Sequence, residues 1–376
     1  MIFENGITNK VAYSRPALGF ICSLAMFSNS AHSSVKSDFC ETLISAASDH
    51  QNNYVLEQEL MAQLSGYIPV WEGEAGMFIR DRSLALRANE HDLSKNVIVS
   101  AVKELGFDPK ELKYEYEYVA PNFASETVRE IVKRRDATSA LATGVLKNIE
   151  VFIPGTKPKS KTVVIGAHYD TQNSLGYFRN HKTTGYESTP GVEDNASGVV
   201  ALFSLLKYFK KHPPKKNIRF LFFDAEEPGQ INNLYEAKGS KLWLEGLSRK
   251  EKKSIEYALI IDMIGTSPNS DTKAMNVSVS STRKAFYTDL LRARNVFHQL
   301  RVDFASPKSL NYLGTYSDSV SFLDKGVPIM LFSSTESAFG LPENYHSPDD
   351  TFHNLNWKHY MKSVNFLKTF IAHNLF

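Results

Sequence analysis

The stretch that decides the fold reads VVIGAHYD at residues 163–170, EDNASG at 193–198 and RFLFFDAEE at 219–227. Its two apolar runs are continuous rather than alternating, which is typical of strands buried on both faces of a sheet. A helical pattern lies between the runs, and polar residues with acidic side chains follow each of them. We therefore expect an α/β arrangement in which the ends of the strands carry the chemistry.

The rest of the chain continues this alternation. Strands are predicted at 147–153, 257–261, 277–280 and 327–332. Helices are predicted at 93–105, 125–135, 282–294 and 357–373, and a further helix follows the loop before residue 197. Ser197 is expected to cap that helix, and Pro213-Pro214 to stop it. The pattern predicts a three-layer, doubly wound, mainly parallel (mixed) sheet with helices on both faces.

Composition limits the class of protein. The chain has 376 residues, 42% of them hydrophobic, and a formal net charge of +2. That content is enough for a large core and argues against disorder. A charge so close to zero provides no general attraction to nucleic acid or to an anionic membrane. We expect a soluble enzyme or binding protein without a nucleic-acid partner.

The N-terminus resembles a secretion signal. Lys10 and Arg15 precede an apolar run at 17–27, and small residues follow it. Because 11 residues are too few to span a bilayer, we predict a cleaved signal at 1–31 and a secreted or periplasmic protein. The alternative is a buried N-terminal helix. Residues 32–85, with helical stretches near 39–47 and 54–64, form an extension or a removable pro-segment, and 86–376 the catalytic domain.

Ligands of doubly wound sheets bind beyond the carboxyl ends of the strands. The polar residues found there, together with one from the turn before the 197 helix, are His168, Asp170, Asp194, Glu226, Glu227, Asp262 and His346. Carboxylates gathered at one edge repel one another unless protons or cations neutralise them. Two histidines among the carboxylates favour zinc over calcium or magnesium, which prefer oxygen ligands alone.

Two short pairs suggest separate roles. Glu226 and Glu227 are neighbours at a strand end, so their side chains point in different directions, and one can bind metal while the other serves as a base. His168 and Asp170 lie on the same side of an extended chain, so Asp170 can accept the second imidazole N–H. Taken singly, His168 could be a structural histidine, the two glutamates a solvated turn and Asp194 a capping residue. Asp262 is harder to explain in this way, because a buried carboxylate needs a partner.

The motifs together resemble the co-catalytic zinc aminopeptidases, a family that also contains glutaminyl cyclases and the peptidase-like ectodomain of transferrin receptor. GAHYDT, EDNASG, FDAEEPG, IIDMIG, GVPIMLFS and YHSPDDT occur in the family's order, and the match covers about residues 93–376. The resemblance implies that His168, Asp194 and Asp262 hold one zinc ion. It also implies that Asp194, Glu227 and His346 hold a second.

The resemblance further implies that Glu226 is the proton shuttle for a metal-bridging water and that Asp170 orients His168. The substrates would be peptide or protein N-termini. Ser319 stands where family members commonly carry a histidine after Ser317 and Asp318, and an oxyanion-assisting tyrosine has no clear counterpart. Three functions stay open at this point: a metallo-exopeptidase with two zinc ions, a glutaminyl-cyclase-like acyl transferase with one, and a non-catalytic binding domain.

Overall fold

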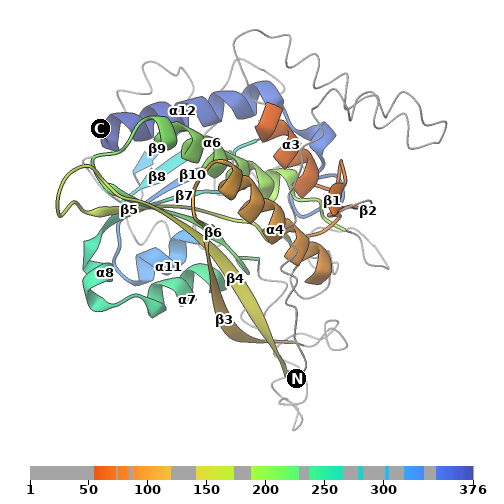
Figure 1. Cartoon of the computed structure of the whole chain (residues 1–376), viewed down its shortest axis with the longest axis horizontal. Coiled ribbons are helices and arrows are strands. Elements are labelled where there is room, and N and C mark those ends of the chain that lie inside the picture. The colour runs from red at the N-terminus through yellow and green to blue at the C-terminus, as the bar shows by residue number, and fades with distance from the viewer. Residues whose placement is uncertain are drawn as a thin grey trace, which may run out of the picture. The chain divides into compact units, whose positions relative to one another are not determined.

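A computed structural model gives the fold (Figure 1). It describes residues 55–72, 75–83, 88–119, 141–172, 188–227, 237–265, 278–282, 301–304, 317–333 and 344–375. The chain divides into two compact units, residues 1–58 and residues 59–376. Everything described below belongs to the second unit, except the first residues of helix α3 (Val55–Leu64).

A mixed sheet forms the centre of this unit, with described strands in the order β3-β4-β6-β5-β7-β10-β8-β9. The strands are β3 (Lys110–Val119), β4 (Leu141–Ile153), β5 (Thr162–His168), β6 (Asn217–Phe223), β7 (Ile255–Ile261), β8 (Ser278–Ser281), β9 (Arg301–Phe304) and β10 (Ile329–Ser333). The four central strands, β6, β5, β7 and β10, are parallel neighbours. Strands β3 and β4 are added antiparallel at one side, and β8 pairs antiparallel with β10 at the other.

Helices cover both faces of the sheet (Figure 1). On one face lie α4 (Ala88–Glu104), α6 (Ser197–Lys211) and α12 (Trp357–Leu375). On the other lie α7 (Lys238–Gly246), α8 (Arg249–Ser254) and α11 (Ser319–Asp324). The predicted three-layer, doubly wound α/β fold is therefore confirmed, and the carboxyl ends of the parallel strands all point to one edge.

Apolar side chains explain why these layers adhere. Every residue of β5 is buried, as the continuous apolar run predicts for a central parallel strand. Below the sheet, the rings of Phe223, Trp243 and Phe322 pack with centroids 6.1–6.5 Å apart. Each fully buried side chain of this size contributes roughly 1.5–3 kcal/mol relative to its exposed state. Above the sheet, Phe332 packs on Phe366 and Phe370 of α12.

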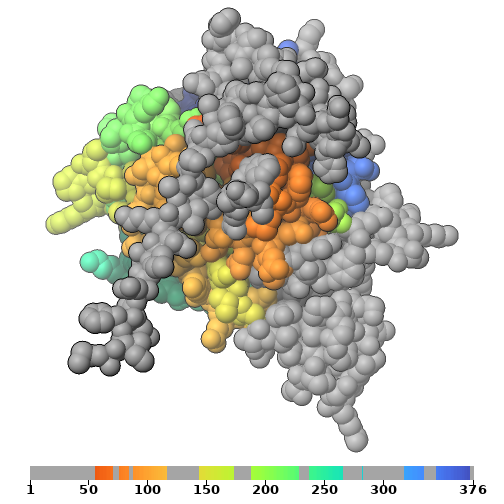
Figure 2. Space-filling model, turned by 45° about the vertical axis from the view of Figure 1, so that its right-hand side comes forward, coloured from red at the N-terminus to blue at the C-terminus, as the bar shows by residue number. Residues whose placement is uncertain are grey.

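The segment before α4 belongs to the same compact unit as the sheet. It contains the short hairpin of β1 (Val70–Glu72) and β2 (Ala75–Met77), and a chain segment that runs to residue 83. Figure 2 shows the orange residues of α4 and β3 at the surface beside the yellow of β4. The domain boundary at residue 85 stays a prediction. Of the described helices, none is both long and apolar enough to cross a membrane.

Several local predictions differ from the structure. Ser197 does not cap α6: it is the first helical residue, and its hydroxyl donates to the carbonyl oxygen of Glu193. Strand β4 begins at Leu141, six residues before the predicted start, because its residues 141–150 pair with the unpredicted strand β3. The signal at 1–31 and the predicted helices at 39–47 and 125–135 lie outside the described residues, as does 282–294 after its first residue.

Candidate metal centre

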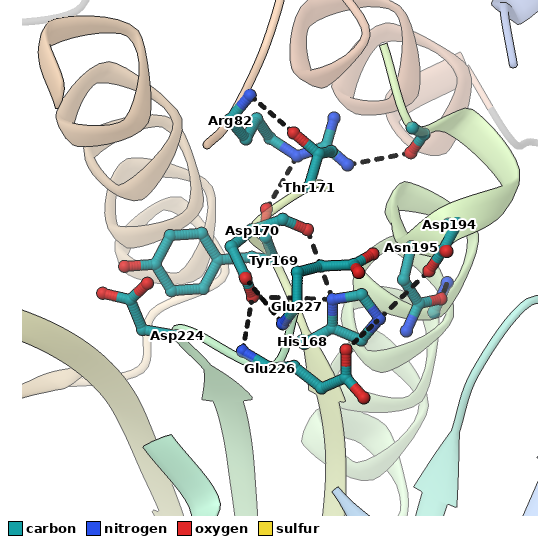
Figure 3. Close-up of polar contacts among 12 residues, drawn as sticks. Arg82, His168, Tyr169, Asp170, Thr171, Asp194, Asn195, Asp224, Glu226 and Glu227 are labelled. Carbon is teal, nitrogen blue, oxygen red and sulfur yellow. Dashed lines mark hydrogen bonds and ion pairs between the residues drawn. The ribbon is translucent and has the colours of Figure 1, made fainter. Parts of the chain in front are cut away.

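The structure brings all seven predicted site residues together at the carboxyl edge of the sheet. Figure 3 shows five of them: His168, Asp170, Asp194, Glu226 and Glu227. His168 ends β5, and Asp262 follows β7 directly. Glu226 and Glu227 lie in the turn after β6. The remaining three are Asp170, just after β5, Asp194 in the irregular turn η3 (Val192–Ala196), and His346 in the chain before α12.

Asp194 lies between the two histidines. Its Oδ1 is 3.2 Å from Nε2 of His168, and its Oδ2 is 3.1 Å from Nε2 of His346. Asp262 Oδ1 lies 3.5 Å from the first imidazole, and Glu227 Oε2 lies 3.2 Å from the second. Among the described residues, two groups of three ligand atoms share Asp194, and within each group the atoms lie within 4.8 Å of one another. His168, Glu226 and Glu227 form a third group that meets the same distance.

Glu226 lies on the His168 side of the cluster. Its Oε2 lies 3.9 Å from Nε2 of His168, whereas the neighbouring Glu227 approaches His346. The two glutamates thus face different imidazoles, as adjacent residues at a strand end should. Glu226 remains close enough to the cluster to exchange a proton with a molecule bound there.

Asp170 supports both strand ends at once (Figure 3). Its carboxylate accepts the main-chain N–H groups of Glu226 and Glu227, each at 3.1 Å. The same carboxylate lies 3.5 Å from Nδ1 of His168, but the atom within hydrogen-bond distance of Nδ1, at 3.2 Å, is the main-chain oxygen of Asp170. The structure thus places the carboxylate of Asp170 beside Nδ1, and the same carboxylate also holds the glutamate turn.

Backbone conformation sets this edge apart from the rest of the sheet. Four described residues other than glycine have positive φ, and three of them adjoin or form the cluster. Ala225 (φ 54°) precedes Glu226, Met263 (φ 52°) follows Asp262, and His346 itself has φ 52°. Such left-handed conformations are unfavourable for residues with a Cβ and persist where the surroundings impose them, often at functional sites.

The segment 193–195 (Glu-Asp-Asn) connects the turn that carries Asp194 to the end of β7 through hydrogen bonds. Glu193 Oε1 accepts the N–H of Gly265 at 3.0 Å. Asn195 donates to the carbonyl oxygen of Ile261 at 2.9 Å and accepts the N–H of Met263 at 3.2 Å, so it holds the chain on both sides of Asp262. These hydrogen bonds give each polar residue of the segment a physical role beside the ligand itself.

Electrostatics show how unfavourable the cluster is without cations. Burial raises the pKa of Glu226 well above its usual value, and the nearby carboxylates raise it further although His168 opposes them. Burial likewise raises the pKa of Glu227 to about 7 against the attraction of His346. Burial alone would raise the pKa of Asp194 as well, but its two imidazole neighbours hold it below the usual range. Burial would lower the pKa of His346, yet the carboxylates of Glu227 and Asp194 raise it to about 10.

The residues present fit bound cations. Among the described residues, six buried carboxyl groups surround two imidazoles, and these are Asp170, Asp194, Glu226, Glu227, Asp262 and Asp318. The buried atoms His168 Nε2, Asp262 Oδ1 and Glu227 Oε1 have no hydrogen-bond partner in the described part of the chain. Buried charges normally pair or bind metal, and mixed nitrogen and oxygen ligands suit zinc.

Sequence reasoning overlooked three residues at this site. Asp350 accepts the N–H groups of Glu193 and Asp194, at 2.7 and 3.1 Å. Asp318 is fully buried, and burial raises its pKa to about 7. Arg82 hydrogen-bonds to the main chain beside the ligands. Asp350 and Asp318 stand within or beside recognised motifs, so their positions offered a signal, whereas nothing in the sequence around Arg82 did.

Solved structures of known proteins share this fold. A zinc aminopeptidase from Bacillus subtilis, BSAP, superposes with a TM-score of 0.58 at 16% identity, covering 85% of this chain and 94% of its own. A glutaminyl cyclase from Fimbriiglobus ruber gives a TM-score of 0.58 at 15% identity, covering 84% and 93%. At these identities the likeness concerns the fold, which is that of the zinc exopeptidases.

The family follows from the sequence. The profile of Peptidase family M28 matches residues 148–370, more than half of the chain, and the chain belongs to that family. It is 27% identical over 257 residues to the uncharacterized protein YfbL of Escherichia coli, covering 64% of this chain and 74% of that protein. It is 26% identical over 236 residues to aminopeptidase YwaD of Bacillus subtilis, covering 60% of this chain but only 45% of that protein.

Proposed function

We propose that this chain is a zinc-dependent aminopeptidase that hydrolyses the N-terminal peptide bond of peptides or proteins, with two zinc ions at the cluster. One observation carries the proposal. Asp194 directs one carboxylate oxygen toward each of two histidines, and each histidine has a further carboxylate beside it. The family membership and the aminopeptidase YwaD among the relatives support the same reading.

The ligand sets follow from the two groups of atoms. His168, Asp194 and Asp262 would hold one ion, and Asp194, Glu227 and His346 the other. Zinc ions so placed would supply Lewis-acid activation of water and of the scissile carbonyl group. His168 and His346 must be neutral at Nε2 to bind, so cation binding replaces the protons that the carboxylates otherwise hold on these imidazoles.

Glu226 would then act as the proton shuttle. Its carboxylate takes the proton of the attacking water and later delivers it to the leaving amine, which a single buried group can do in sequence. Asp170 fixes the turn by accepting the N–H groups of both glutamates. Burial raises the pKa of Glu226 well above its usual range, which favours uptake of the water proton by its carboxylate.

The remaining parts of the proposal concern the whole protein. Residues 86–376 would form the catalytic domain, residues 1–31 a secretion signal, and the enzyme would work in a secreted or periplasmic location. Support for the location comes from the basic and apolar pattern of residues 10–27. Unblocked N-termini are the expected substrates because the related aminopeptidases are named for that activity.

Two isosteric substitutions at adjacent positions test the roles. Glu226→Gln removes the shuttle but no proposed ligand, so it should keep its zinc and lose about 100- to 10,000-fold in turnover. Glu227→Gln should instead lose zinc from the second position. Metal analysis and peptide hydrolysis are measured on both proteins. Substantial hydrolysis by Glu226→Gln would refute the assignment of the base.

A further inference from the structure

Arg82 is fully buried although it lies outside the residues matched by the family profile. It follows the β1–β2 hairpin and precedes α4, in the segment that the sequence suggested as an extension or pro-segment. Burial lowers the pKa of Arg82 to about 10, against nearby carboxylates including those of Asp350 and Asp170, so the side chain stays charged at neutral pH. A buried charge is costly unless it is paired and hydrogen-bonded, which directs attention to what this arginine binds.

Its guanidinium group binds main-chain oxygens. Nε donates to the carbonyl oxygen of Tyr169 at 2.7 Å, and one terminal nitrogen donates to Pro190 at 2.6 Å and to Leu64 at 2.5 Å. The other terminal nitrogen donates to Gly191 at 2.8 Å. Such short, charge-assisted hydrogen bonds are stronger than those between neutral groups. The planar fork thus joins three separate segments of the chain.

Two of these acceptors adjoin the proposed ligands. Tyr169 lies between His168 and Asp170, and Gly191 begins the turn that carries Asp194. The main-chain N–H of Arg82 makes a further hydrogen bond to the segment after β5, donating to the hydroxyl of Thr171 at 2.9 Å (Figure 3).

The contact at Gly191 is tight. The residue has φ 62°, and a Cβ there would lie 2.8 Å from a terminal nitrogen of Arg82 and 2.3 Å from Thr171. Only glycine accepts this conformation and this approach without strain. The conformation of the turn before Asp194 therefore leaves just enough room for the guanidinium group of Arg82.

We propose that Arg82 is a positioning residue of the metal site: it fixes the main chain beside His168 and Asp170 to the turn that carries Asp194. The inference rests on the proposed zinc site. It implies that the catalytic unit begins before residue 86, with the described residues 59–72 and 75–83 as a permanent part of it rather than a removable pro-segment. Arg82 acts through the placement of the ligands and touches neither metal nor substrate.

Three variants of the full chain test this role. Arg82→Met removes the charge and all side-chain donors while keeping an unbranched stem of similar length. Arg82→Lys keeps the charge but replaces the fork with a single ammonium that has three donors. Arg80→Met is the matched control, because Arg80 is exposed and its structural contact is made by its main-chain N–H to Glu90.

Zinc affinity is measured by competition with a chromophoric chelator, and the visible spectrum is recorded on the cobalt-substituted proteins. Loss of groups that orient metal ligands typically weakens binding about 10–100-fold. The zinc affinity of Arg82→Met should be lower than that of the parent by a factor in that range, and its cobalt spectrum should differ. The affinity of Arg82→Lys should lie between those of Arg82→Met and the parent. The affinity of Arg80→Met should equal that of the parent. Circular dichroism confirms that each metal-free protein is folded at the assay temperature. Arg82→Lys, the milder change, provides the test where Arg82→Met does not fold.

The outcomes separate this inference from the proposed function. A parent chain that binds no zinc refutes the proposed function, and the inference with it. A parent that binds zinc, beside a folded Arg82→Met or Arg82→Lys protein with parental affinity and an unchanged cobalt spectrum, refutes the inference alone. A purely structural arginine would lower the unfolding temperature of the metal-free variants without changing the affinity of the folded molecules.

Discussion

Asp170→Asn changes one atom at the joint between two strand ends. Asp170 is fully buried, and its two carboxylate oxygens accept separate N–H groups, from Glu226 and Glu227. The asparagine keeps one acceptor oxygen, but its amide nitrogen must face an N–H donor at the other position. A hydrogen bond to a charged group contributes about 1.5–3 kcal/mol, and the buried donor left without a partner adds to the loss.

This loss acts mainly on the placement of Glu227 and His168, both proposed ligands. We therefore expect zinc affinity to fall about 10–100-fold, and turnover at saturating zinc to fall because Glu226 moves with the same turn. Chelator competition measures the affinity, and hydrolysis of an unblocked peptide measures the turnover. Asp324→Asn, at an exposed carboxylate at the end of α11, is the control. Parental affinity and turnover in Asp170→Asn would refute the argument that this carboxylate organises the site.

Two further predictions concern stability. Although burial alone would lower the pKa of His91, Asp224 at 2.8 Å raises it above 6.5, so the pair stabilises the fold fully below pH 6.5 and less as the pH rises through the raised value. The difference in urea-unfolding free energy between the parent and His91→Gln should shrink above pH 6.5, and a constant or growing difference would contradict this. Gly166→Ala should cost about 1–3 kcal/mol in the same assay because its Cβ would lie 2.4 Å from the ring of Phe223. Gly246→Ala, with 3.9 Å of clearance, should cost much less, and equal losses would speak against overpacking.

The central sheet could be predicted because strands that are buried on both faces have a simple sequence pattern, a continuous run of apolar residues. Residues 163–167 and 220–223 are continuous apolar runs, and the structure places them in adjacent parallel strands. Polar residues directly after such runs, including His168 and Asp262, must then meet at one edge. His346 follows its strand only after an intervening loop, so strand position alone determined its place at this edge less closely, and its role as a ligand came from the family resemblance.

Other features were not recoverable in the same way. Strand β3 does alternate, with Leu112, Tyr114 and Tyr116 more buried than the charged residues between them, but this weaker period was overlooked. Arg82 left no trace at all. Its partners are main-chain carbonyl oxygens, which every residue possesses, so no complementary acidic residue marks the contact in the sequence. Only the folded chain shows that this arginine meets the ligand loops.

The most direct measurement is the zinc content of the purified chain together with the products that it releases from unblocked peptides. Two zinc ions per chain, with release of free N-terminal amino acids, are predicted from the shared position of Asp194 between His168 and His346. Blocking the N-terminus of the same peptides is the control and should abolish release. One zinc ion with loss of ammonia from N-terminal glutamine would indicate a glutaminyl cyclase instead. A zinc-loaded protein that shows neither aminopeptidase nor cyclase activity would contradict the proposed function outright.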